Sequence, residues 1–192
     1  AMQRQIAKST QESMEKYLLY SLHDATDKKA AIIAALRLLA EHYGLQRAYI
    51  LRYGTDELMH PTGYTWNVDG FDFDYSVFEE TDQCELKGFF ADTGAQGKQV
   101  YNNLSVITPS MRSALEKERI KQCIHYKYTE GGRLLGLIGL DNCRTDGYEL
   151  SQVQMEELIR LLRVIALFAF QQSLAEHDEA VMELLNQLPT CA

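Results

Sequence analysis

Apolar side chains recur at helical spacing through the first part of the chain. Met14, Tyr17, Leu18, Ser21 and Leu22 fall on one stripe, because residues three and four apart share a face of a helix. The stripe predicts a first helix that ends near residue 23.

A second helix is expected after a short polar stretch, in which Asp24 or Thr26 would cap its start. Gly44 is expected to end it, since glycine is a usual residue just after a helix. The apolar positions between these limits again have helical spacing: Ile32, Leu36, Leu39, Ala40 and Tyr43.

Beyond the second helix the pattern becomes that of strands. The apolar and aromatic run from Arg47 to Tyr53 predicts one strand, and Leu58 to Asn67 predicts a weaker one. Residues 67 to 97 carry many acids and many aromatic side chains, so we expect a long excursion there, with one helical piece from Cys84 to Ala91. Lys98 to Leu104 is expected to form a short strand.

A hairpin is the clearest unit of the sequence. Two apolar runs, Ile120 to Tyr128 and Leu134 to Asn142, flank the pair Gly131-Gly132, and Gly-Gly between such runs is a strong hairpin signal. A helix is expected before the hairpin, from Thr108 to about Lys117, because proline at position 109 suits the first helical turn.

The chain is expected to return to helix after the hairpin. Ser151 to Gln154 fits a capping box, and it opens a long apolar helix through Leu158, Ile165 and Phe168. The whole order predicts an α+β fold with a central antiparallel sheet of five or six strands. The terminal helices would cover one face, and the excursion would form a small-molecule pocket on the other.

Composition narrows the class of function. The 192 residues have a net charge of −8 and a pI near 5.1, which disfavours binding to nucleic acid. The longest apolar stretch, Val164 to Phe170, is too short to span a membrane. Four cysteines without metal-binding or disulfide spacing fit reduced thiols and a cytoplasmic location: Cys84, Cys123, Cys143 and Cys191.

The hairpin carries a family resemblance. Its sequence, RIKQCIHYKYTEGGRLLGLIGLDN from Arg119 to Asn142, resembles the corresponding segment of GAF domains. Five residues of the second strand match the family pattern L-x-G-x-I-G-x-D in register: Leu134, Gly136, Ile138, Gly139 and Asp141. The resemblance covers residues 11 to 175. Residues 1 to 10 are expected to be a tag or a disordered N-terminus, and residues 176 to 192 a helical linker or coiled-coil extension.

The resemblance implies a function. GAF domains sense small molecules in signalling proteins, so this chain is expected to regulate an output module and not to be an enzyme itself. The segment Ile138 to Asn142 also resembles GAF units that precede diguanylate cyclase (GGDEF) modules. The sequence identifies neither a ligand nor a cofactor, and no metal site is expected.

Six residues are expected to line the pocket: Trp66, Tyr75, Phe90, Tyr101, Cys123 and His125. Aromatic rings with a polar group suit pocket walls, although the same rings could simply fill a second core. Cys123 and His125 lie two positions apart and so share a face of their strand. They could form a nucleophile and base, or they could be packed core residues.

The sequence is also compatible with two other functions. The chain could be a GAF domain that has lost its ligand and serves only dimerisation. It could also resemble the GAF proteins that reduce free methionine sulfoxide, if Cys84 and Cys123 approach each other. Cys84 also lies where bilin-binding GAF domains anchor their chromophore, but the neighbouring motifs of that group are absent.

A heptad stripe in the tail suggests a homodimer. Apolar residues spaced by seven predict a parallel dimer helix at Leu167, Leu174, Val181 and Leu188, with Phe170, His177 and Leu184 at the second heptad position. The alternative is an amphipathic helix that packs on its own domain.

Overall fold

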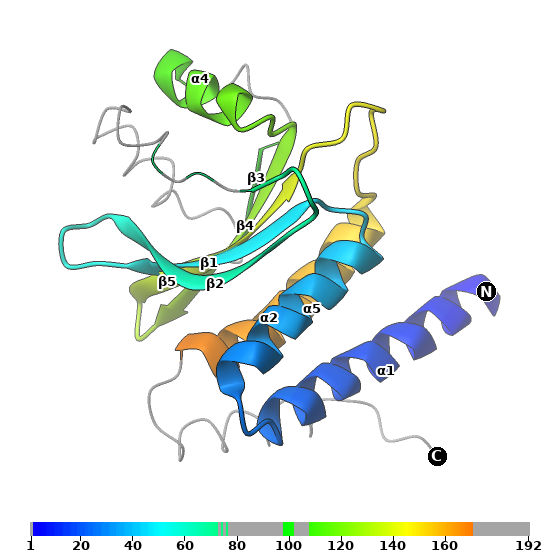
Figure 1. The fold of residues 1–192 in the computed structure, drawn as a ribbon. Coiled ribbons are helices and arrows are strands. Elements are labelled where there is room, and N and C mark those ends of the chain that lie inside the picture. Colours follow the sequence, from blue (N-terminus) through cyan, green and yellow to red (C-terminus); the bar gives the residue numbers. More distant parts are fainter. Residues whose placement is uncertain (1, 73, 75, 77–97, 102–107, 171–192) are drawn as a thin grey trace.

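The computed structural model describes residues 2–72, 74, 76, 98–101 and 108–170, and for residues 2–12 and 98–101 it describes the backbone alone. Five strands form one antiparallel sheet in the order β2-β1-β5-β4-β3 (Figure 1). Their bounds are β1 Arg47–Tyr53, β2 Met59–Asn67, β3 Lys98–Tyr101, β4 Gln122–Glu130 and β5 Arg133–Asn142.

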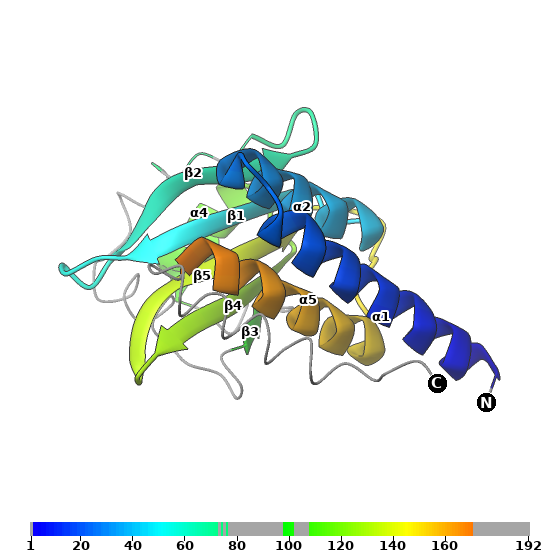
Figure 2. The ribbon, with the colours of Figure 1, turned by 90° about the horizontal axis from the view of Figure 1, so that it is seen from below.

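Three helices cover one face of the sheet and a short one lies over the other. Figures 1 and 2 show α1, α2 and α5 together on one side, here called the three-helix face, and α4 on the opposite side, the α4 face. The bounds are α1 Met2–His23, α2 Lys28–His42, α4 Pro109–Lys117 and α5 Gln152–Phe170. The predicted placement of the terminal helices on one face is confirmed. None of the helices described is long and apolar enough to cross a bilayer.

Local signals account for most of the element boundaries. Gly131 and Gly132 turn the hairpin with φ values of 54° and 79°, a region that favours glycine. At the start of α5, Ser151 Oγ accepts from the Gln154 N–H at 3.3 Å while Gln154 Oε1 accepts from the Ser151 N–H at 2.9 Å. The predicted capping box is therefore confirmed.

Two boundaries differ from the predictions. Asp27, and not Asp24 or Thr26, caps α2, since its carboxylate accepts the Ala30 N–H at 2.9 Å. Helix α1 begins at Met2, before residue 11, at which the family resemblance begins.

The alternation of side chains along each strand builds two cores. Ala48 and Ile50 of β1 point into the core under the three helices, whereas Tyr49 and Leu51 point into a core shared with α4. Because both faces are covered, the central strands are apolar along most of their length. In β5, Leu137 and Ile138 are fully buried, and Leu135 is half-buried.

Candidate functional site

The α4 face of the sheet holds a group of buried polar side chains at alternate strand positions. Arg47 of β1 pairs in register with Asp141 of β5, and Gly139 of β5 lies between Tyr49 and His125 on the two neighbouring strands. Residues directly opposite on neighbouring strands share a face. The group, none of whose members is more than 4% exposed, is Arg47, Tyr49, Cys123, His125, Lys127 and Asp141.

Gly139 lets the Tyr49 ring lie flat across β5. A Cβ at position 139 would come within 2.2 Å of the ring. The ring passes over the glycine, and its hydroxyl reaches Asp141 Oδ1 at 3.2 Å and His125 Nε2 at 3.4 Å. The hydroxyl donates its single proton to Asp141, and His125 Nε2 lies within hydrogen-bond distance of the hydroxyl oxygen.

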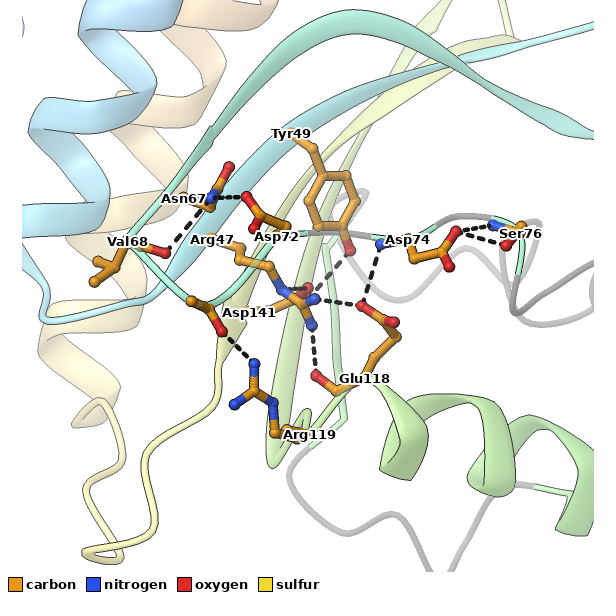
Figure 3. Close-up of polar contacts among 11 residues, drawn as sticks. Arg47, Tyr49, Asn67, Val68, Asp72, Asp74, Ser76, Glu118, Arg119 and Asp141 are labelled. Atoms are coloured by element: carbon orange, nitrogen blue, oxygen red, sulfur yellow. Dashed lines mark hydrogen bonds and ion pairs between the residues drawn. The ribbon is translucent and has the colours of Figure 1, made fainter.

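Arg47 is held between two carboxylates (Figure 3). Its Nη1 donates to Glu118 Oε2 at 2.5 Å and its Nη2 to the Glu118 carbonyl at 3.0 Å. Its Nε lies 3.2 Å from Asp141 Oδ2. The side chains are 2%, 8% and 0% exposed for Arg47, Glu118 and Asp141, so this is a buried ion triad in which one cation meets two anions.

The end of α4 also holds the start of the excursion. The Asp74 N–H donates to Glu118 Oε2 at 3.4 Å. Arg119, the next residue, donates to the Gly70 carbonyl, and its guanidinium lies 4.6 Å from the centroid of the Phe71 ring. Glu118 and Arg119 therefore connect Gly70, Phe71 and Asp74 to the sheet through Arg47 (Figure 3).

Burial sets the protonation of the group. It lowers the pKa of His125 to about 3, and nearby Lys127 adds to this effect. Burial raises the pKa of Asp141 to about 6, against the opposing effect of Arg47. Burial and then the charge of Asp141 raise the pKa of the Cys123 thiol well above its usual range. At neutral pH the imidazole is thus neutral, the thiol is protonated and the Asp141 carboxyl is ionised.

The structure places the six predicted pocket residues in different ways. Cys123 and His125 lie together on the α4 face. The backbone of Tyr101 pairs with that of Cys123, but its side chain is not among those described. Tyr75 and Phe90 lie outside the described residues. The pocket itself stays a prediction.

The predicted position of Trp66 is wrong. Trp66 pairs with Ala48, and both side chains belong to the core under the three helices, where Trp66 is half-buried. The register of β2 against β1 decides the face of every β2 side chain. We therefore assign Trp66 no role on the α4 face.

Sequence reasoning missed Arg47, Tyr49, Lys127, Glu118 and Asp141 as members of this site. One signal could have found three of them. Arg47, Lys127 and Asp141 are charged residues within strands that are otherwise apolar, and such residues are seldom fully buried unless they are paired. Counting their alternation along the strands would have placed all three on one face.

Leu167 is not available for the dimer helix that its heptad spacing suggested. It is 8% exposed within the chain's own three-helix core. Phe170 lies in the same core at 1% exposure, and its ring stacks on Tyr128 with 5.4 Å between centroids. The stripe therefore begins as a core stripe of this domain. The other three dimer positions, Leu174, Val181 and Leu188, lie outside the described residues and stay a prediction.

Comparison with known proteins bears on the fold. No family model matches the sequence, and no curated protein matches it. Solved structures do match, 156 chains in all.

Three of these structures represent the match. A domain of a sensor histidine kinase from Sinorhizobium meliloti has a TM-score of 0.53 and 13% identity, with 81% of this chain and 99% of that one covered. The GAF3 domain of a Synechocystis protein, in its photoproduct state, has a TM-score of 0.58 and 9% identity, with 81% and 97% covered. A far-red absorbing protein with bound biliverdin has a TM-score of 0.62 and 13% identity, with 82% and 98% covered. At such low identities the likeness lies in the fold, and the chain has a GAF-like fold.

Proposed function

We propose that this chain is a regulatory domain that binds a small molecule on the α4 face of its sheet and controls an output module of a signalling protein. The observation that carries the proposal is the buried polar group around Arg47, Tyr49, His125 and Asp141. Burying polar groups costs free energy that an apolar core would avoid. Binding sites, in contrast, combine apolar walls with a few convergent polar groups.

The similar structures support the same class of function. One of them holds biliverdin, and another is a domain of a sensor histidine kinase. These are properties of those proteins, and they agree with a sensory role for a GAF-like fold. The output module, for which the sequence suggests a diguanylate cyclase, and the homodimer stay predictions.

The chemistry of Cys123 favours regulation over catalysis. A reactive cysteine needs a lowered pKa and access to its substrate. The Cys123 thiol is 1% exposed, and its pKa is raised by burial, so it is protonated and a poor nucleophile. The second cysteine of a sulfoxide reductase, Cys84, lies outside the described residues.

Native mass spectrometry of protein purified from its own host tests the proposal. The wild type should carry a bound small molecule. Tyr49→Phe keeps the ring and removes the hydroxyl that contacts Asp141 and His125. Its affinity for the bound molecule should fall about tenfold, the equivalent of one hydrogen bond at about 1.4 kcal/mol, and its occupancy should fall accordingly. Tyr126→Phe, on the three-helix face, is the matched control and should keep the ligand.

The outcomes separate the alternatives. A wild type without any bound molecule would favour the purely structural domain. Equal occupancy in Tyr49→Phe and Tyr126→Phe would show that the ligand binds away from the polar group. Turnover of methionine sulfoxide would show that the chain is an enzyme.

A further inference from the structure

An apolar groove runs between α1 and α2, on the side of the molecule away from the candidate site. Its hollow has a volume of about 230 Å³. An engineered cavity of about 150 Å³ is large enough to hold benzene, so this one has room for at least a leucine-sized side chain. Its walls include Leu18, Ala31, Ala35 and Leu38, and Tyr17 stands at its rim with 61% of its surface exposed.

Helix α5 delivers the chain to one end of this groove. Lys28, the first residue of α2, donates from Nζ to the carbonyls of Leu22 and His23 at the end of α1, at 2.8 and 2.9 Å. The same Nζ lies 5.7 Å from the centroid of the Phe168 ring in the last described turn of α5. The last described turn of α5 therefore lies beside the turn that joins α1 to α2 (Figure 2).

The 22 residues from 171 to 192 have the sequence of an amphipathic helix. Ser173-Leu174-Ala175-Glu176 matches a capping box, which predicts a new helix start at Ser173. A new start allows the chain to change direction after α5. Apolar side chains then recur at heptad positions that include Leu174, Val181, Leu184 and Leu188.

The described part of the same stripe already packs on this domain. Leu167 and Phe170 occupy the two heptad positions before residue 174, and both face the chain's own core. The groove's lining carries one charged residue, Glu41, so the docking is expected to rest on apolar contacts.

We propose that residues 171–192 dock along the α1–α2 groove of their own chain. Held by the short link from Phe170, the segment has a high effective concentration at the groove, of the order of millimolar. A ligand or partner that displaces it would expose the groove, so the docking would bear directly on how this domain passes a signal. The proposal is independent of the ligand on the α4 face.

Cysteine labelling of the full chain tests this docking. In a background with Cys84→Ser and Cys191→Ser, a reporter cysteine is introduced by Ala34→Cys on the exposed wall of the groove. Docking should slow maleimide labelling of this cysteine at least tenfold relative to Leu174→Glu plus Val181→Glu, which charges the stripe. The matched control, Gln172→Glu plus Asn186→Glu, adds the same charge at another heptad position and should leave the protection intact.

Two further measurements decide whether the groove is occupied by residues 171–192 of the same chain or by a second copy. Ser113→Cys, exposed on α4, should label at the same rate in every background, which shows that the substitutions do not unfold the domain. Protection of position 34 should be the same at 1 and 100 µM protein, roughly a hundredfold range, because docking within one chain does not depend on concentration. Protection that grows with concentration in a dimer would assign the groove to a second copy and overturn the proposal. Equal labelling of all variants would also overturn it, because the groove would then be empty.

Discussion

At the scale of single residues, close contacts with aromatic rings explain why β5 has glycine at positions 136 and 139. A Cβ at Gly136 would come within 2.4 Å of the Phe170 ring on the three-helix face, and one at Gly139 within 2.2 Å of the Tyr49 ring on the α4 face. Each glycine therefore receives an aromatic ring that lies directly on the backbone. Both glycines belong to the L-x-G-x-I-G-x-D pattern of this strand.

Gly139→Ala should destabilise the fold by about 1–3 kcal/mol, because the added methyl overpacks the site and displaces the Tyr49 ring. Tyr49→Val removes the ring and should make the alanine tolerable. Urea denaturation of the wild type, both single variants and the double variant measures the coupling between the positions, expected at about 1–3 kcal/mol. Additive losses would show that the ring does not depend on the glycine.

At the scale of elements, the sequence predicted most of the secondary structure. Strand β1, the hairpin and α5 lie where periodicity, Gly-Gly and the capping box place them, since these signals act over a few residues. Such local signals could not show on which face of the sheet the Trp66 side chain lies. Its strand pairs with β1 through a register shift between Tyr49 and Leu51, and a slip of one residue reverses the face of a side chain.

The candidate site was predictable only in part, for a related reason. Cys123 and His125 follow from alternation within one strand. The contact between Arg47 and Glu118 joins residues 71 positions apart, and it depends on how α4 packs over the sheet. No local pattern in the sequence encodes that packing.

The buried ion triad joins α4 to the sheet, so substitutions of its members should lower the free energy of unfolding by different amounts. Arg47→Met leaves Glu118 and Asp141 buried without their cation and should cost about 3–5 kcal/mol. Glu118→Gln should cost less, about 1–3 kcal/mol, because Arg47 keeps Asp141 and an amide oxygen can still accept from Nη1.

Urea denaturation compares these variants with Arg37→Met, which breaks an exposed ion pair with Glu41 on α2 and should cost under about 1 kcal/mol. If Glu118→Gln costs as much as Arg47→Met, the two carboxylates do not share the arginine as described.

At the scale of the whole molecule, Asp141 and His125, both buried on the α4 face, make the free energy of unfolding depend on pH in opposite directions. The pKa of Asp141 is raised from 3.8 to about 6, so between these values the folded state keeps a proton that the unfolded chain has released. Its contribution to stability falls as pH rises through this window. The pKa of His125 is lowered from 6.5 to about 3. The unfolded chain then binds a proton that the folded state does not, and this contribution rises with pH.

Between pH 4 and pH 6 the two contributions should nearly cancel in the wild type, since each changes by about 1.4 kcal/mol per pH unit. Removing one group leaves the pH dependence that the other group gives to stability without its opposing contribution. His125→Gln should lose stability relative to the wild type as pH rises from 4 to 6, by about 2 kcal/mol in total, and Asp141→Asn should gain a similar amount. Urea denaturation at pH 4, 5 and 6 measures both trends, with Tyr126→Phe as a control that removes no group titrating in this range. If the stability of both variants changes with pH in the same way, the two side chains are not buried as described. Opposite slopes are expected only when burial on the α4 face raises the pKa of Asp141 and lowers that of His125.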